Sequence, residues 1–160
     1  MARIKIDLPA KFSYSTNIPI RITDINFGGH VGNDTILSIV HEARAQFFTY
    51  CGYSELDFAG AGTIMSDVAI EYKNQTYYGD NILASVAVGE ITKVAFDLFY
   101  KLEKRSADGK LIPVAFAKTW MVCYDYDVKK VIPIPGEALK KLQICRLCIC
   151  VPNLPVFLSL

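Results

Sequence analysis

Hydrophobic and polar residues alternate in the first part of the chain. Residues 12–22 (FSYSTNIPIRI) carry β-branched and aromatic side chains at a period close to two, which predicts a strand. The following segment, TDINFGGHVGND, contains three glycines and several turn-forming residues, so we expect a loop there. This loop is the most unusual segment of the sequence.

The period then changes to that of a helix. Apolar residues recur three or four positions apart, at Ile36, Val40, Ala43, Phe47 and Cys51. The side chain of Asn33 or Asp34 is suited to cap the first turn, and Gly52 stands where a helix commonly ends in glycine. The pattern predicts a helix of about 17 residues, longer than the mean of about 11–12. Leu37, Ile39 and Phe48 widen its apolar face, which indicates that neighbours surround it on more than one side.

The rest of the chain is mostly extended. Turn signals at residues 78–81 and 107–110 separate runs that alternate like strands, and these runs cover residues 63–72, 82–91, 94–105 and 112–126. Pro133 and Pro135 end regular pairing, and residues 136–142 predict a short helix.

This order of elements predicts an α+β fold in which one apolar helix is wrapped by a curved antiparallel sheet of about five strands. Such an arrangement, the hotdog fold, buries both elements without a further layer, although other α+β folds share the order. We expect one domain over residues 1–143. The tail 144–160 (ICRLCICVPNLPVFLSL) is apolar, contains two prolines and is too short to span a bilayer. We expect it to pack on the domain or on a neighbouring subunit.

Composition narrows the classes of function. The chain has 160 residues, of which 52% are hydrophobic, and its net charge is +1. This charge argues against general attraction to nucleic acid or to an anionic membrane. The first residues lack the apolar core of a secretion signal, so we expect a cytoplasmic protein. Cys145, Cys148 and Cys150 cluster without a fourth ligand at suitable spacing, so we expect no metal site.

The loop and helix carry a family resemblance. An arginine (Arg21), an acidic loop residue (Asp24), a turn at residues 29–33, the sequence Glu-Ala-Arg at residues 42–44 and a closing glycine (Gly52) follow in that order. A Gly-Asp turn (Gly79, Asp80) and a strand with a proline exit (VAFAKTWMVCYDYDVKKVIPIP) follow later. Together these motifs, across roughly residues 12–139, resemble the 4-hydroxybenzoyl-CoA thioesterase-like family of hotdog-fold enzymes.

The resemblance implies a hotdog fold and homodimers, often paired into homotetramers. It implies active sites at the subunit interface, between the helix N-terminus of one protomer and a strand of the other. The substrate would be an acyl-CoA or acyl-carrier-protein thioester, and neither an organic cofactor nor a metal would be needed. On this basis we expect a hydrolase that releases free acid and thiol.

Thioester hydrolysis needs a group that stabilises negative charge on the carbonyl oxygen. A glycine-rich loop leading into a helix presents free amides and the positive end of the helix dipole. We therefore assign backbone contacts with the carbonyl to this turn, at Gly29, Val31, Gly32 and Asn33. The alternative is a tight strand-to-helix turn that binds no ligand.

Hydrolysis also needs a group that activates water. The best-known family members have a catalytic aspartate in an Asp-x-Asp pair of this loop, whereas the pair here is Asp24-Ile25-Asn26. Asn26 cannot act as a base, but it can orient water or hydrogen-bond the carbonyl.

Four other residues are candidates for the base. Asp34 begins the helix, and its alternative role is a first-turn acid. His30 has a side chain suited to base catalysis, and its alternative role is to rigidify the turn by hydrogen bonding. Glu42 lies two helical turns after Asp34, roughly on the same face of the helix. Its alternative role is to pair with a neighbouring side chain or with another subunit. Asp24 is the fourth candidate, or it anchors Arg21. We expect Asp34→Asn to cause the largest loss of activity.

Two other functions fit the sequence. Enoyl-thioester hydratases of the same fold use an Asp-x-Asn-Pro-Ile-His loop, but here Phe27 replaces the proline and His30 stands one residue later. A hotdog protein that binds acyl thioesters without hydrolysing them is the other.

Overall fold

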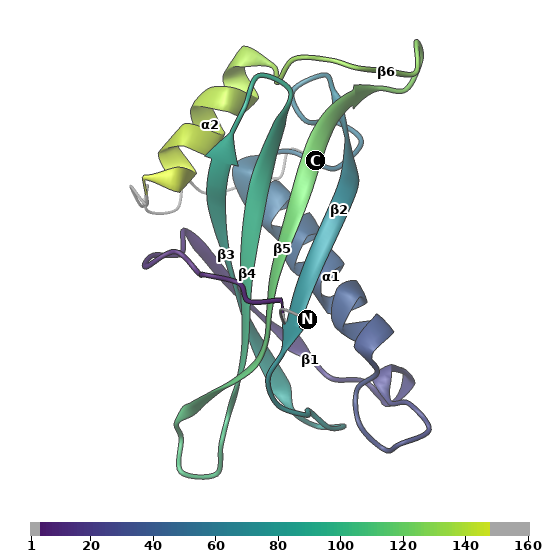
Figure 1. Ribbon diagram of the computed structural model, residues 1–160, viewed down its shortest axis with the longest axis vertical. Coiled ribbons are helices and arrows are strands. Elements are labelled where there is room, and N and C mark those ends of the chain that lie inside the picture. Colours follow the sequence, from purple (N-terminus) through teal and green to yellow (C-terminus); the bar gives the residue numbers. More distant parts are fainter. Residues whose placement is uncertain (1–3, 148–160) are drawn as a thin grey trace, which may run out of the picture.

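The computed structural model describes residues 4–147. Figure 1 shows a long helix lying along one face of a curved sheet, with a second helix beside the sheet. The elements in chain order are β1 (Tyr14–Pro19), η1 (Ile22–Asp24, a single 3₁₀ turn), α1 (Asn33–Cys51), β2 (Gly62–Tyr72), β3 (Asn81–Ile91), β4 (Ala95–Arg105), β5 (Leu111–Asp125), β6 (Lys130–Val131) and α2 (Gly136–Arg146).

The sheet is antiparallel, with strand order β1-β3-β4-β5-β2, and the short β6 pairs with β5. β1 and β2 are adjacent in sequence but lie at opposite edges, because α1 connects them. The helix therefore crosses the sheet between its two edges. This is the hotdog arrangement expected from the sequence.

The core lies between α1 and the sheet. The buried face of α1 presents Val40, Ala43, Phe47 and Phe48, which follow the predicted helical period. Alternate residues of β4, among them Phe96, Leu98 and Tyr100, meet this face and are fully buried. Buried residues recur at every second position on the strand and at every third or fourth position on the helix, and these two faces pack against each other.

The predicted bounds of most elements agree with the structure to within two residues. The helix ends at Gly52 in a left-handed conformation (φ 87°), as its glycine predicted. The expected strand 12–22 is shorter, since residues 22–24 form the turn η1. The expected side-chain cap by Asn33 or Asp34 is wrong, because Gly32 is the N-cap residue and no side chain within residues 4–147 caps the helix.

The C-terminal helix is longer than predicted. α2 continues to Arg146, so the domain boundary expected after residue 143 falls inside this helix. Cys145, from the predicted tail, is buried in the core cluster. The prediction that the tail packs on the protein concerns mainly residues 148–160, which lie outside the described residues.

The outer edge of β2 pairs with no strand among residues 4–147. β2 has 11 residues, whereas β1 at the other edge has six. Within the described part of the chain, no helix is both long and apolar enough to cross a membrane.

Candidate functional site

The loop between η1 and α1 is held by Asn26 and His30. The Asn26 amide N–H donates to the carbonyl of His30 at 2.8 Å. The Asn26 side-chain oxygen accepts from the amide of Gly28 at 2.8 Å, as in an Asx turn. Asn26 therefore shapes the turn, and its Nδ2 lies 3.5 Å from Nε2 of His30.

The loop needs glycine at positions 28 and 29 for two different reasons. Gly29 has a φ of +77°, which glycine adopts without strain. Gly28 lies against the imidazole of His30, where an added Cβ would come within 2.9 Å of the ring. The ring Nδ1 lies 3.2 Å from the carbonyl of Gly28. The glycines thus let His30 fold back over its own loop, leaving the side chain half-buried.

The first turn of α1 offers free backbone donors. The amides of Gly29, Val31 and Gly32 donate within the chain, to the carbonyls of Asn26, Thr76 and Asp24. The amides of Asn33, Asp34 and Thr35 come next and have no helical acceptor. No other acceptor within residues 4–147 is bonded to them. The free donors therefore begin at Asn33, the last of the four residues assigned from the sequence.

Asp34 lies beside these donors. Its side chain is exposed and makes no hydrogen bond or ion pair with any other residue of the described chain. It folds back over the N-cap, where a Cβ added to Gly32 would collide with the Asp34 carboxylate. A carboxylate is thus held next to the positive end of the helix dipole with its oxygens uncommitted.

Asp24 has a structural role instead. Its carboxylate is buried and accepts from the backbone amide of Arg21 at 2.7 Å. The Arg21 guanidinium also pairs with it at 3.3 Å. The Asp24 carbonyl accepts from the amide of Gly32. Asp24 therefore joins η1 to the start of α1, and both of its side-chain oxygens are occupied.

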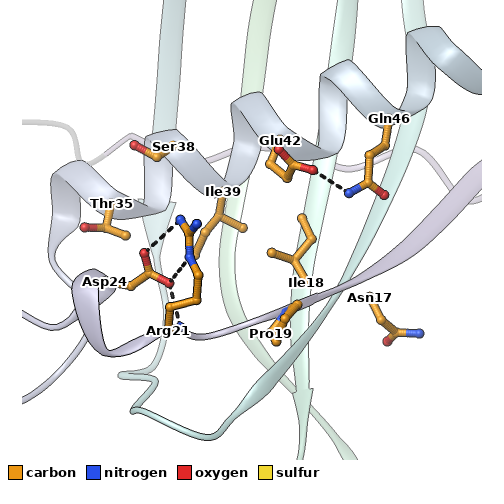
Figure 2. Close-up of a pocket in the computed structure, with 10 residues that line it drawn as sticks. All are labelled: Asn17, Ile18, Pro19, Arg21, Asp24, Thr35, Ser38, Ile39, Glu42 and Gln46. Atoms are coloured by element: carbon orange, nitrogen blue, oxygen red, sulfur yellow. Dashed lines mark hydrogen bonds and ion pairs between the residues drawn. The ribbon is translucent and has the colours of Figure 1, made fainter.

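A first cleft, the β1-side cleft, lies between β1 and α1 and has a volume of about 290 Å³. Figure 2 shows the Arg21–Asp24 pair at one end and the Glu42–Gln46 pair further along α1. Its lining residues are Asn17, Ile18, Pro19, Arg21, Asp24, Thr35, Ser38, Ile39, Glu42 and Gln46. Two candidate carboxylates, Asp24 and Glu42, thus line this cleft.

Glu42 is held by a fixed neighbour. Its Oε1 accepts from Nε2 of Gln46 at 2.6 Å. The other end of that amide accepts from the hydroxyl of Thr16 at 2.6 Å, which fixes its orientation. Glu42 also lies eight residues after Asp34, about 12 Å along the helix. Within one protomer it is therefore remote from the free amides.

A second cleft, the β2-side cleft, lies on the other side of the α1 N-terminus and has a volume of about 250 Å³. Its floor is apolar, from Val31, Ile36 and Val114. The other lining residues are His30, Asn33, Tyr72, Lys73, Asn74, Gln75 and Thr76. His30, Val31 and Asn33 from the sequence prediction thus meet here.

The Gly-Asp turn supports this second cleft. Asp80 accepts from the hydroxyl of Thr76 at 2.8 Å, from the amide of Tyr77 at 2.9 Å and from Lys104 at 2.8 Å. Burial acts to raise the pKa of Asp80, but these three donors together hold it below its usual value. The Thr76 carbonyl in turn accepts the amide of Val31 at 2.9 Å. The turn thereby connects the β2–β3 loop to the loop between η1 and α1, which is the catalytic loop candidate.

Sequence reasoning missed the wall that β2 provides. The Tyr72 hydroxyl donates to the carbonyl of Asn33 at 3.0 Å and ties the end of β2 to the start of α1. These residues are 39 positions apart, so no local pattern predicts the contact. The sequence signal for this wall was the Gly-Asp turn at Gly79 and Asp80, to which the sequence alone assigns no role in the site.

Comparisons with known proteins agree with this fold. No curated protein sequence matches the chain, but many solved structures share its fold. 4-Hydroxybenzoyl-CoA thioesterase from Pseudomonas sp. strain CBS-3 superimposes with a TM-score of 0.72 at 16% identity, covering 80% of this chain and 97% of that one. 1,4-Dihydroxy-2-naphthoyl-CoA thioesterase from Synechocystis gives 0.71 at 17%, covering 81% and 95%.

The chain is also similar to a mutant 4-hydroxybenzoyl-CoA thioesterase complexed with 4-hydroxybenzoyl-CoA, with a TM-score of 0.73 at 17% identity, covering 81% of this chain and 97% of that one. Residues 20–142 match the family model of the thioesterase-like superfamily. This match spans most of the chain, including α1, the strands β2 to β6 and every lining residue of the β2-side cleft. The chain therefore belongs to the thioesterase-like superfamily.

Proposed function

We propose that this protein hydrolyses an acyl thioester of coenzyme A or of acyl carrier protein, at the N-terminus of α1. The observation that carries the proposal is the uncapped first turn. The amides of Asn33, Asp34 and Thr35 have no acceptor within residues 4–147, and a cleft with an apolar floor adjoins them. The superfamily and the named thioesterases of the same fold support the reaction class.

In this proposal the acyl group occupies the apolar floor of the β2-side cleft. Its carbonyl oxygen accepts from the free amides, which stabilise negative charge where it develops. Asp34 removes a proton from water as the oxygen attacks the carbonyl carbon. When the tetrahedral intermediate collapses, the C–S bond breaks and the leaving thiolate takes up that proton. The balanced products are a carboxylic acid and a free thiol, and water is the only co-reactant.

Asp34 suits this role better than the other carboxylates. A general base must lie within hydrogen-bond reach of the water that attacks, and Asp34 is in the same helical turn as the free amides. Asp24 is occupied by Arg21, and Glu42 is about two turns away. His30 and Asn26 hold the loop that borders the site, so we give them positioning roles.

We propose that the active form is a homodimer paired along β2. β2 has 11 residues, its outer edge pairs with no strand among residues 4–147, and such edges are usually covered. In a two-fold antiparallel pairing, the end of one β2 lies against the start of the other. Because Tyr72 ends β2 and borders the cleft, the second copy would complete that cleft. We place the reaction in the cytoplasm and assign it no metal or organic cofactor.

Release of free thiol tests the function. Purified protein is incubated with a panel of short, long and aromatic acyl-CoA thioesters, with heat-denatured protein as the control for spontaneous hydrolysis. We expect saturable thiol release with at least one substrate. Loss of 2-enoyl absorbance without thiol release would instead indicate a hydratase. Binding of a nonhydrolysable acyl-CoA analogue, with no turnover of any thioester in the panel, would establish the non-catalytic alternative.

A further inference from the structure

Two buried thiols face each other where the C-terminal end of α1 meets α2. The Sγ atoms of Cys51 and Cys145 lie 3.9 Å apart, and the residues are 8% and 5% exposed. Cys51 is the last residue of α1, at the opposite end of that helix from the free amides. The pair is therefore independent of the proposed hydrolysis.

We propose that Cys51 and Cys145 form a thiol–disulfide exchange site for a low-molecular-weight disulfide, and that the resulting bond fastens α2 to α1. An S–S bond is about 2.05 Å long, so the two sulfurs must approach by roughly 2 Å. Rotation of the two side chains, together with a small displacement of α2, provides this movement. α2 has only 11 residues, so few contacts have to adjust when it moves.

Cys145 is the attacking thiol. The pKa of Cys145 is below its usual value, because the Cys51 thiol hydrogen-bonds to it and Lys141 adds positive charge, against an opposing effect of burial. Lys141 lies one helical turn before Cys145. Conversely, the hydrogen bond to Cys145 and burial raise the pKa of Cys51. The thiolate is the nucleophile, and Cys145 lies in the last turn of α2, one residue from its end, whereas Cys51 packs beneath it. Cys145 therefore reacts first and Cys51 second.

The exchange balances in two steps. The Cys145 thiolate attacks a disulfide RSSR, forming Cys145–S–S–R and releasing RS⁻. The Cys51 sulfur then loses its proton and attacks Cys145 Sγ, forming the Cys51–Cys145 bond and releasing the second RS⁻. Two protein thiols are oxidised, and one RSSR is reduced to two RSH. Oxidised glutathione is a suitable RSSR.

Fraying of α2 gives the reagent access to Cys145. Ile144 and Leu147, on either side of this cysteine, are 38% and 67% exposed. No side chain in the described part of the chain caps the N-terminus of this helix, and the helix ends at Arg146, one residue after Cys145. The end of a short helix opens at a lower free-energy cost than the core, so exchange at Cys145 does not require global unfolding.

Cys123 provides a matched control. It is fully buried on β5, and burial raises the pKa of its thiol to about 11. β5 is a central strand, between β4 and β2, and does not fray like α2. Cys123 should therefore remain a free thiol under conditions in which the proposed pair has reacted completely.

Peptide mapping after oxidation tests the proposal. The full chain, and the same chain with Cys148→Ser and Cys150→Ser, are incubated with oxidised glutathione, alkylated and digested without reductant. We expect a peptide that links Cys51 to Cys145, and an alkylated Cys123. In the Cys51→Ala variant we expect Cys145 to be trapped as a glutathione mixed disulfide. In the Cys145→Ala variant we expect Cys51 to stay free.

Oxidation should also raise the melting temperature by roughly 10 °C, because the bond closes a loop of 94 residues in the unfolded chain. The shift should disappear with dithiothreitol and in Cys51→Ala, and persist in Cys123→Ser. Complete alkylation of both cysteines after oxidation of the folded protein would refute the proposal. So would a linkage that requires denaturant. If a variant fails to fold, the map of the unmodified chain still decides.

Discussion

The β1-side and β2-side clefts lie on opposite flanks of the same helix terminus and differ in what their polar groups are doing. The β1-side cleft contains two candidate carboxylates, but Arg21 holds Asp24 and Gln46 holds Glu42 (Figure 2). Among residues 4–147, no carboxylate lines the β2-side cleft, but the cleft has an apolar floor and adjoins amides that have no acceptor in this part of the chain. Asp34 lines neither cleft, but it lies in sequence between Asn33 of the β2-side cleft and Thr35 of the β1-side cleft.

This difference shows that the type of residue lining a cleft is a poor guide to its chemistry. Carboxylates whose oxygens accept strong hydrogen bonds fix the backbone and side chains around them. Reactive groups are those left uncommitted beside a space that excludes water. On this criterion the β1-side cleft stabilises the start of α1, whereas the β2-side cleft is the one in which we propose that the acyl group binds.

The sharpest test replaces the carboxylate of Asp34, and separately that of Glu42, by the corresponding amide. Asp34→Asn should lower kcat by about 10³-fold, because the amide keeps the size of the side chain but cannot accept the proton of water. Glu42→Gln should change kcat by less than about threefold, since it alters a side chain remote from the reacting carbonyl. Steady-state thiol release measures both. A larger loss for Glu42→Gln would transfer the chemistry to the β1-side cleft.

Asp24→Ala should act on stability more than on chemistry. It leaves the amide of Arg21 without its acceptor and is expected to reduce the free energy of unfolding by about 2 kcal/mol. Urea denaturation followed by circular dichroism measures this change. Asp127→Ala, at an exposed turn residue, is the control and should stay within about 0.5 kcal/mol. A variant of full stability and no activity would make Asp24 catalytic.

His30→Ala should have an intermediate effect on the reaction. The imidazole holds the carbonyl of Gly28 at 3.2 Å, and a lost hydrogen bond of about 1.4 kcal/mol corresponds to a tenfold change in kcat. We expect about this loss in thiol release, with the pH profile otherwise unchanged. A much greater loss, together with disappearance of one limb of the pH profile, would identify His30 as the base.

Asp80→Asn should loosen the wall of the β2-side cleft only. The pKa of Asp80 is lowered in the folded state. Its ionised form therefore stabilises the fold at pH values above the ordinary pKa of an aspartate, about 3.9, and this contribution is lost as the pH falls through the lower folded-state pKa. The variant should lose about 1 kcal/mol at pH 7, with the difference from the unmodified protein shrinking in acid. Urea titrations at several pH values measure this, and a constant difference would contradict it.

Much of the fold could be predicted because its signals are local. The helical period from Ile36 to Cys51, the strand period of residues 82–91 and the left-handed Gly52 each depend on residues close in sequence. Two details at the start of α1 also involve residues close in sequence. Asp24 closes η1 by accepting the amide of Arg21, which was one of its two expected roles. Gly32 takes the N-cap position that was expected for Asn33 or Asp34.

The sequence by itself determined the order of the elements, the long apolar helix and the residues of the catalytic loop candidate, because side-chain periods and turn chemistry act over a few positions. Only the tertiary structure decided which of those residues are free. The partners that occupy Val31 and frame Asn33 come from Thr76 and Tyr72, about 40 positions away, and those contacts exist only after the sheet has closed around α1.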